Sequence, residues 1–352
     1  MQAIEPIIKK KSIRSLSAEE LKDFFVASGD KAFRAKQVYE WIWKRSARSF
    51  AEMTNLSKET RTLLETNFSL NPVTIDQKQV SNDGTIKFGF RLHDGYLVEG
   101  VLIPADDRMT ACISSQVGCS LTCKFCATGY MDRKRNLEAY EIYDQVVLIK
   151  EAAEEHYNLP LSNIVLMGMG EPLLNYTNVL KGIERVTAED GLNIASKRIT
   201  LSTAGIAKMI TKLGDDKVKF KLALSLHAAN DVKRNTIMPI NESNNLAVLK
   251  ESLLYFHKMT GNPITFEYIV FDGVNDTMQD AKELYTFAKN IPCKINIIEY
   301  NPIQEANYMN ASIDNLGQFK KVLTDKGIIV NIRRSRGKDI DAACGQLAIK
   351  QK

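Results

Sequence analysis

The sequence of 352 residues predicts an α/β protein whose core is a partial (βα)6 barrel, and two observations lead to this prediction. Beyond about residue 108, short apolar segments of strand length alternate with helical segments, as in right-handed βαβ units of a parallel sheet. About six such units fit, whereas a closed barrel has eight in roughly 250 residues. The first third of the chain has other patterns, so we expect smaller elements ahead of the barrel.

The first 70 residues are predicted to form a small helical domain. Ser17 and Glu20 have the spacing of a capping box ahead of the helical periodicity of AEELKDFFVAS. A second helix with one apolar face spans about Arg34–Ser46, and a third begins at the N-cap Ser57. Three short helices therefore make a bundle over residues 1–70.

Residues 71–104 are predicted to form a β-hairpin extension. Apolar and polar residues alternate from about Val73 onward, and the turn signal Asp94-Gly95 separates TIKFGFRL from YLVEGVLI. Asp83-Gly84 is a second signal of the same kind, just before these strands. This spacing is typical of a meander of hairpins.

The barrel is assigned to residues 105–332. Its strand candidates are TACISS, NIVLMG, RITLST, KLALSL, ITFEYIV, KINIIEY and IIVNIRR. Helical stretches such as EIYDQVVLIKEAAEEH separate most of them. In parallel α/β folds the chemistry takes place at the carboxyl ends of the strands. The tail of residues 333–352 is not core-like, and we expect it to cover that mouth of the barrel.

Composition places the chain among globular proteins, with 44% hydrophobic and 25% charged residues. Lys and Arg total 47 against 42 Asp and Glu, and the net charge of +5 is too small to indicate nucleic-acid binding by itself. The sequence has no apolar run of about 18 residues and no signal-peptide pattern. We therefore expect a cytoplasmic protein without a membrane partner.

Three of the six cysteines lie within eight residues, at Cys119, Cys123 and Cys126. Three thiolates in one loop can hold an iron–sulfur cluster, and a fourth iron without a cysteine ligand is left open for the amino and carboxylate groups of S-adenosylmethionine (SAM). A zinc site is the main alternative, but zinc normally takes four cysteine or histidine ligands, and disulfides are rare in this compartment. The spacing, with Phe125 before the third cysteine, resembles the signature of the radical SAM superfamily.

Polar residues and glycine follow several predicted strands at their carboxyl ends. Each could lie beside SAM, although polar residues and glycine commonly end strands in ordinary turns. Together they mark one rim, where a glycine allows close backbone approach and a carboxylate can bind the SAM ammonium. The residues are Gly170, Glu171, Ser202, Ser225, Leu226, His227 and Asn301.

Four further residues have an ordinary structural interpretation when each is taken singly. Cys112 lies in a predicted strand and Cys344 in the tail, and a lone cysteine is usually a small buried hydrophobe. Cys293 has the same interpretation. Glu99 lies in the alternating strand YLVEGVLI, where the simplest expectation is a solvated face.

Basic residues form three clusters that could contact RNA, although a solvated face explains any one of them equally well. The middle cluster is interleaved with Tyr39, Trp41 and Trp43, a mixture suited to phosphates and stacked bases. The first cluster is Lys9–Lys11 with Arg14. The RNA contacts expected from the other two are Arg34, Lys36, Lys44, Arg45, Arg333, Arg334 and Arg336.

Longer strings resemble one family within this superfamily. CISSQVGCSLTCKFCATG, MGMGEPLLN, ITLSTAGI, LALSLHA, YNPI and RGKDIDAACGQLA are similar to the RlmN family of adenine carbon-2 RNA methyltransferases, as is the N-terminal FRAKQVYEWIW. The resemblance implies that Cys119, Cys123 and Cys126 ligate a 4Fe-4S cluster and that the rim residues bind SAM. It also implies that Cys344 accepts a methyl group, that Cys112 is its resolving partner and that Glu99 is the proton acceptor.

The resemblance also implies a reaction scheme and partners. One SAM methylates Cys344, and a second yields a 5′-deoxyadenosyl radical that removes hydrogen from the S-methyl group. The carbon radical adds to adenine, a base removes the ring proton, and Cys112 attacks Cys344 to form a disulfide and release the product. The expected substrates are 23S rRNA and tRNA. The expected electron donor is a reduced flavodoxin- or ferredoxin-type protein, and the enzyme is expected to be a monomer.

Two other functions stay open at this point. The sister family Cfr methylates carbon 8 of the same rRNA adenosine and shares the cluster motif, but the segment RRSRG before Cys344 resembles RlmN. A non-catalytic iron–sulfur protein that binds RNA or senses redox state is the other alternative. Such a protein would need neither the SAM rim nor Cys344.

Overall fold

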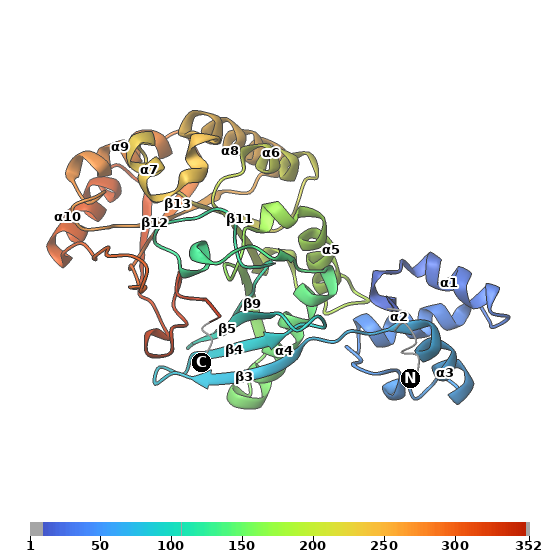
Figure 1. The fold of residues 1–352 in the computed structure, drawn as a ribbon. Helices are drawn as coiled ribbons and strands as arrows, with labels where there is room; N and C mark the ends of the chain where they lie inside the picture. Colours follow the sequence, from blue (N-terminus) through green and yellow to red (C-terminus); the bar gives the residue numbers. More distant parts are fainter. Residues whose placement is uncertain (1–9, 107, 350–352) are drawn as a thin grey trace, which may run out of the picture.

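A ten-stranded mixed sheet organises most of the chain in a computed structural model, which describes residues 10–106 and 108–349 (Figure 1). The strand order is β14-β13-β12-β11-β10-β9-β6-β5-β4-β3, and the first seven of these strands run parallel. The parallel strands are β6 (Arg108–Cys112), β9 (Leu161–Leu166), β10 (Ile199–Thr203), β11 (Lys221–Ser225), β12 (Ile264–Ile269), β13 (Cys293–Ile298) and β14 (Ile329–Arg333).

Helices connect these strands and cover the outer face of the curved sheet (Figure 1). They are α4 (Ala139–Tyr157), α5 (Tyr176–Thr187), α6 (Ala207–Asp215), α7 (Asp231–Ile237), α8 (Leu246–Thr260), α9 (Met278–Ala288) and α10 (Ile313–Thr324). Six strand–helix units followed by β14 confirm the predicted partial barrel, because β14 and β3 stand at opposite ends of the strand order. Within the described residues, none of the helices is long and apolar enough to cross a membrane.

The predicted hairpin extension is the antiparallel part of the same sheet. Its strands are β3 (Thr74–Val80), β4 (Ile86–Arg91) and β5 (Leu97–Ala105). The turn glycines Gly84 and Gly95 have φ of 84° and 87°, a backbone conformation that favours glycine, so both predicted turns form. Because β5 also pairs antiparallel with β6, the extension continues the barrel wall and places its β3–β4 turn near the barrel mouth.

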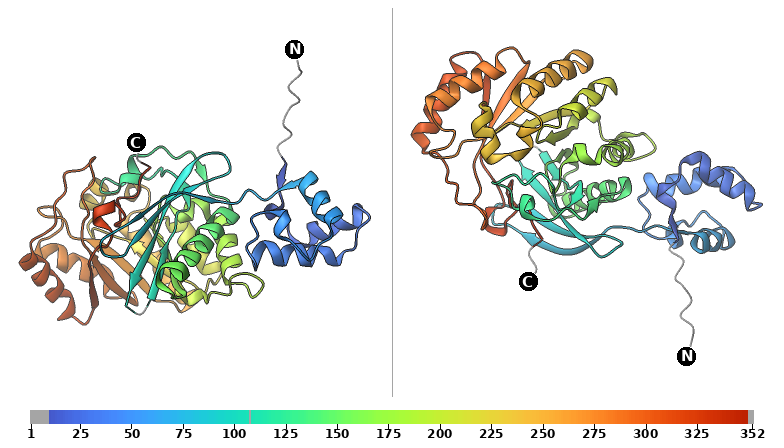
Figure 2. Two further views of the ribbon diagram at one scale, coloured as in Figure 1. Left: turned by 90° about the horizontal axis from the view of Figure 1, so that it is seen from below. Right: turned by 45° about the horizontal axis from the view of Figure 1, so that its top comes forward.

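The N-terminal helices form a lobe to one side of the sheet (Figures 1 and 2). They are α1 (Ala18–Ala27), α2 (Phe33–Trp43) and α3 (Lys58–Asn67), and a short parallel pair links β1 (Lys11–Ser12) to β2 (Phe68–Ser69). The capping box of Ser17 and Glu20 forms as predicted, and the Ser57 side chain accepts the backbone N–H of Thr60. Residues 1–9 of the predicted helical domain, which include Lys9 of the first basic cluster, lie outside the described part of the chain.

Buried polar and aromatic contacts join this lobe to α4. Arg14 Nη1 donates to Asp144 Oδ1 at 2.6 Å, and both side chains are almost fully buried. The Tyr143 ring packs edge-on against Trp43, with 5.2 Å between ring centroids. Trp43 is only 3% exposed, so its interpretation as a base-stacking side chain is wrong. Arg14 likewise belongs to this interface and not to an RNA-facing basic cluster.

The Arg14–Asp144 pair leads to a prediction about stability. We expect Arg14→Ala to lower the free energy of unfolding by about 3–5 kcal/mol, because it leaves a buried carboxylate without its cation. Urea unfolding followed by tryptophan fluorescence measures this change. Arg48→Ala is the matched control, since the Arg48–Glu151 pair is half-exposed and should contribute less than about 1 kcal/mol. Equal effects of the two substitutions would contradict the prediction.

The C-terminal tail crosses the barrel mouth after β14. The Gly337 N–H donates to Asp83 Oδ2 at 2.8 Å, and the Asn82 N–H donates to Asp339 Oδ2 at 3.0 Å, so the tail is tied to the β3–β4 turn. Farther along, the Ala127 N–H donates to the Gly345 carbonyl at 2.7 Å. The tail therefore bridges the antiparallel extension and the cysteine-rich loop.

Candidate active site

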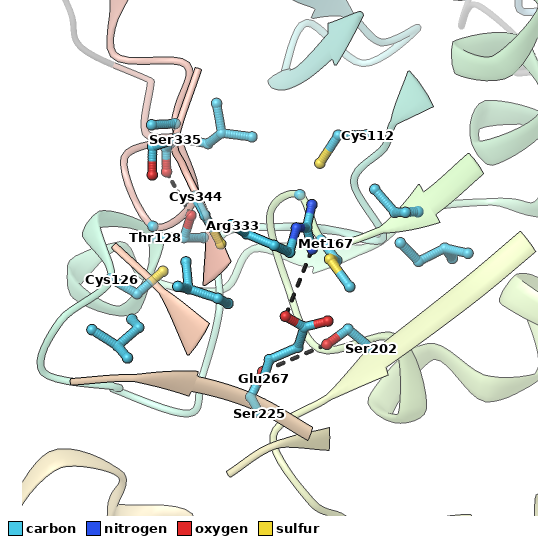
Figure 3. A pocket seen from close by; sticks show the side chains of 18 of the residues that line it. Cys112, Cys126, Thr128, Met167, Ser202, Ser225, Glu267, Arg333, Ser335 and Cys344 are labelled. Atoms are coloured by element: carbon cyan, nitrogen blue, oxygen red, sulfur yellow. Dashed lines mark hydrogen bonds and ion pairs between the residues drawn. The ribbon is translucent and has the colours of Figure 1, made fainter. Parts of the chain in front are cut away.

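A cavity of about 490 Å³ lies at the carboxyl ends of the parallel strands, beneath the tail (Figure 3). This volume is in the range of small-molecule sites. Ten of the residues predicted for catalysis, the cluster or SAM line it: Cys112, Cys119, Cys123, Cys126, Gly170, Glu171, Ser202, Ser225, His227 and Cys344. Glu99, Leu226 and Asn301 lie outside the cavity wall, although all three are buried.

The cysteine-rich loop follows β6 and turns tightly. The Cys126 N–H donates to the Cys123 carbonyl at 3.3 Å, and the Gly129 N–H donates to the Cys126 carbonyl at 2.8 Å. Burial raises the pKa of the Cys119 thiol to about 11 and also raises those of Cys123 and Cys126. Ionised neighbours raise the pKa values of Cys119 and Cys123 further, so the three sulfurs share one region.

These thiols suit an iron–sulfur cluster because the cations of a cluster offset the cost of ionising buried cysteines side by side. Leu121 and Phe125 from the same loop pack with Phe271 and Ile298 into an apolar shell next to them. Such a shell limits the access of water to a bound cluster. The residues present therefore fit the predicted cofactor.

Glu171 is buried and held in one orientation. Its carboxylate accepts the backbone N–H of Leu173 at 3.0 Å and that of Ala204 at 2.8 Å. Burial raises the pKa of Glu171, against the effect of these hydrogen bonds. Each oxygen keeps lone-pair capacity for a further donor, as an ammonium group would require. The neighbouring Gly170 has φ of 95°, and a Cβ there would meet the Gln116 side chain at 2.5 Å, so its backbone requires glycine.

Arg234 fixes the strand ends that carry the serines. It is fully buried, and its guanidinium donates to the carbonyls of Ala204, Ser225 and Leu226 at 2.7, 3.1 and 3.0 Å. The carboxyl ends of β10 and β11 are thereby held together, and the hydroxyls of Ser202 and Ser225 lie 3.5 Å apart at the cavity. Leu226 takes part in this arrangement only through its backbone carbonyl, and its role in binding SAM stays a prediction.

His227 has an unusual backbone, with φ of 55°, a conformation that non-glycine residues adopt at a cost. Its Nδ1 accepts the Ile269 N–H at 3.1 Å, so the proton of the neutral ring lies on Nε2. Burial, and secondarily Arg234, lower the pKa of His227 to about 3. The ring is therefore neutral and can donate one hydrogen bond from Nε2.

Asn301 connects the end of β13 to the tail. Its Nδ2 donates to the Cys344 carbonyl at 3.1 Å, and its Oδ1 finds no donor among residues 10–106 and 108–349. The side chain is 1% exposed. A buried amide oxygen without a donor is costly, and a ligand that supplies one would satisfy it. Asn301 thus positions Cys344 directly.

Cys112 and Cys344 face the same cavity from β6 and from the tail (Figure 3). Both are free thiols, and the exposed surface of Cys344 opens into the cavity. Burial raises the pKa of Cys112 to about 12, and enclosure within the cavity raises the pKa of Cys344 to about 11 by desolvating the thiol, whereas Arg333 lowers both values. The Arg333 guanidinium extends between the two thiols (Figure 3). Cys112 is buried, as expected for a lone cysteine in a strand, whereas Cys344 is exposed to the cavity.

Glu99 is not on a solvated face, so the simple expectation for it was wrong. It is 3% exposed, and the C-terminal tail contacts its carboxylate on this face of the sheet. One carboxylate oxygen accepts the Ala348 N–H at 2.9 Å, and the other lies 3.4 Å from Lys87 Nζ. Burial raises the pKa of Glu99, and Lys87 opposes that effect. Its role as a proton acceptor stays a prediction.

The predicted RNA contacts separate into two places. Arg333, Arg334 and Arg336 line the cavity. The other four are on the N-terminal lobe, where Lys36, Lys44 and Arg45 are exposed and Arg34 is half-buried beside Asp30.

Glu267 is a site residue that the sequence analysis missed. It lines the cavity from β12 and is 3% exposed. Its Oε1 accepts from Asn296 Nδ2 at 2.9 Å, and its Oε2 lies 3.6 Å from Arg333 Nη1. A glutamate in the middle of the apolar strand ITFEYIV was the available signal, since an unpaired charge is rarely placed in a buried strand.

Comparisons with known proteins agree with this site. Residues 12–70 match the ribosomal RNA large subunit methyltransferase N-terminal domain, and residues 113–288 match the radical SAM superfamily, whose members use a 4Fe-4S cluster and SAM. A relative from Cytophaga hutchinsonii named "Probable dual-specificity RNA methyltransferase RlmN" is 87% identical, and the match covers 100% of this chain and 96% of that protein. A relative of the same name from Flavobacterium johnsoniae is 54% identical, with 98% and 99% covered.

A solved structure has the same fold over nearly the whole chain. The crystal structure of a radical SAM methyltransferase from Sphaerobacter thermophilus superposes with a TM-score of 0.91 at 38% sequence identity. The match covers 97% of this chain and 100% of that one. With the cavity residues described above, these matches establish that the chain belongs to the RlmN family of radical SAM RNA methyltransferases.

Proposed function

We propose that this enzyme methylates carbon 2 of an adenosine in 23S rRNA and of the adenosine 3′ of the tRNA anticodon, and that the methyl group passes through Cys344. The observation that carries this proposal is the placement of five cysteines around one cavity. Three belong to the cluster loop, and Cys112 and Cys344 face it from other elements. A radical enzyme without a cysteine carrier would not require the last two.

The cavity residues divide between the two cofactors. Cys119, Cys123 and Cys126 would hold the cluster, and Gly170, Glu171, Ser202, Ser225, Leu226, His227 and Asn301 would surround SAM, Leu226 through its backbone. When bound, the reduced cluster and SAM together supply the radical that abstracts hydrogen. A fixed carboxylate and a neutral imidazole with one donor are suited to orienting a polar ligand, because neither must change its charge to bind.

Cys344 and Cys112 would perform the thiol chemistry. The Cys344 sulfur faces the cavity and can attack a methyl group after losing its proton, a step that the nearby Arg333 cation favours. Cys112 would later attack Cys344 and release the methylated base. Arg333 lowers the pKa of Cys112 as well, so a single cation assists both thiols. Glu99 would accept the proton from carbon 2, by resemblance to the family.

The partners are proposed on the same basis. RNA would be held by the exposed basic residues of the N-terminal lobe and by the arginines at the cavity mouth. Because such substrates are cytoplasmic RNAs, the enzyme would act in the cytoplasm. A flavodoxin- or ferredoxin-type protein would supply electrons, and the enzyme would act as a monomer.

Mass spectrometry of RNA tests the proposal. We expect 2-methyladenosine at the 23S rRNA and tRNA positions in cells that carry this protein, and unmodified adenosine in cells that lack it. Reconstituted enzyme with SAM and a reductant should form the same product and 5′-deoxyadenosine. A carbon-8 methyl as the main product would assign the Cfr activity instead. Absence of 5′-deoxyadenosine would favour a non-catalytic iron–sulfur protein.

A further inference from the structure

A ladder of polar side chains crosses three strands on the inner face of the barrel. Asn331 on β14, Asn296 on β13 and Glu267 on β12 are direct neighbours in the strand register. Asn331 Nδ2 donates to Asn296 Oδ1 at 3.3 Å, and Asn296 Nδ2 donates to Glu267 Oε1 at 2.9 Å. The ladder fixes the Glu267 carboxylate and leaves Oε2 as its free end.

The free oxygen is an unusual feature of a buried carboxylate. Glu267 is 3% exposed, and across the part of the chain that the structure describes its Oε2 receives no hydrogen bond. The nearest cation is Arg333 Nη1 at 3.6 Å, which is longer than a hydrogen bond. Burying a carboxylate is energetically costly unless donors satisfy it. A group retained at this cost, on the wall of an active-site cavity, points to a ligand that supplies the missing donor.

Glu267 Oε2 and the Arg333 guanidinium place an acceptor next to a donor on one cavity wall (Figure 3). The Watson–Crick edge of adenine has the complementary order, because its 6-amino group donates and the adjacent N1 accepts. Guanine and hypoxanthine have the opposite order at these two positions. Enzymes that act on a base commonly read this edge after extruding the base into a pocket.

The position of Arg333 agrees with the site of reaction. Carbon 2 of adenine is bonded to N1, so a base whose N1 faces Arg333 has carbon 2 close to that guanidinium. Arg333 extends between Cys112 and Cys344, the two thiols of the proposed methyl transfer (Figure 3). A hydrogen bond to N1 also withdraws electron density from carbon 2, which favours addition of an electron-rich carbon radical.

We infer that Glu267 and Arg333 are the residues that recognise the target adenine, with Glu267 accepting from the 6-amino group and Arg333 donating to N1. This inference rests on the proposed function and adds the contacts that select the base. It assigns Arg333 to base recognition in the cavity, in addition to the general RNA contact expected from the sequence.

The test compares two RNA substrates in the reconstituted holoenzyme. One anticodon stem-loop carries adenosine at the target position, and the other carries purine riboside, which lacks only the 6-amino group. We expect the wild-type enzyme to favour adenosine in kcat/KM by at least about tenfold, since sites built to bind a polar group discriminate strongly against its absence. In Glu267→Ala this ratio should fall to within about threefold of unity.

Controls separate base recognition from other roles of Glu267. Glu299→Ala removes a carboxylate just beyond β13 that contacts Lys338 of the tail, and it should keep the wild-type ratio. Glu267→Met retains the side-chain volume but has no carboxylate acceptor, so its preference for adenosine over purine riboside should fall as in Glu267→Ala. The melting temperature of each variant shows whether it is folded. Methylation of Cys344 by SAM without RNA, measured in each Glu267 variant, separates a defect in the use of SAM from a defect in recognition of the base.

The outcomes distinguish this inference from the proposed function. An unchanged ratio in either folded Glu267 variant would overturn the inference. A raised KM for SAM with an unchanged ratio would assign the carboxylate to SAM. A wild-type enzyme that does not methylate adenosine at carbon 2 would instead defeat the proposed function.

Discussion

Cys344→Ala is expected to abolish RNA methylation completely while the cluster still assembles. The Cys344 sulfur faces the cavity, and alanine removes the only atom of this residue that can carry a methyl group. The three cysteines of the cluster loop belong to a separate segment, so their ligation should persist. Mass spectrometry of the RNA product measures the first effect, and iron content with the visible absorption spectrum measures the second.

Cys293→Ala is the matched control for this prediction. Cys293 is at the start of β13, and its Sγ lies 3.9 Å from the Ala288 carbonyl, away from the cavity-lining residues. Its substitution should cost about 1 kcal/mol of stability or less and leave methylation within about twofold of the wild type. Methylation that survives in Cys344→Ala would remove the methyl-cysteine assignment.

Cys112→Ala is expected to trap a covalent adduct between the enzyme and RNA. Without a second thiol to attack Cys344, the bond that joins its sulfur through the new carbon to the base cannot be exchanged. The adduct should migrate as a shifted band on a denaturing gel and should disappear after ribonuclease treatment. Turnover should fall by at least about a hundredfold, because release of the methylated base requires a positioned thiol to attack the Cys344 sulfur.

The double variant Cys112→Ala/Cys344→Ala provides the control for the adduct. It should form no shifted band, because the trapped species requires the Cys344 sulfur. Normal turnover by Cys112→Ala alone would refute the resolving role. An adduct that also forms in the double variant would place the covalent bond on another residue.

Local patterns in the sequence predicted most of the secondary structure. The capping box of Ser17 and Glu20 and the turn glycines Gly84 and Gly95 are decided by residues only a few positions apart. The alternation of strands and helices predicted the partial barrel for the same reason, because each βαβ unit closes through short connections. The spacing of Cys119, Cys123 and Cys126 predicted a cluster loop, since all three ligands belong to one turn.

Contacts between distant segments decided the rest. Trp43 and Arg14 are residue types that often contact RNA, but here both are buried because α4 packs against them. Glu99 is buried on a face that the C-terminal tail contacts through Ala348, which alternation within one strand cannot reveal. In such cases the burial of a side chain depends on residues a hundred or more positions away.

Patterns in the sequence alone predicted the fold class, the cluster loop and, through the resemblance to RlmN, the family to which the chain belongs. Only the tertiary structure brought Cys112 and Cys344 to one cavity and placed Arg333 between them. It also showed that Glu267 Oε2 lacks a hydrogen-bond donor among the described residues. The physical reason is that parallel strands bring their carboxyl ends to a single edge whatever their distance in sequence. Which side chains meet at that edge depends on strand order and register, and these are properties of the folded sheet.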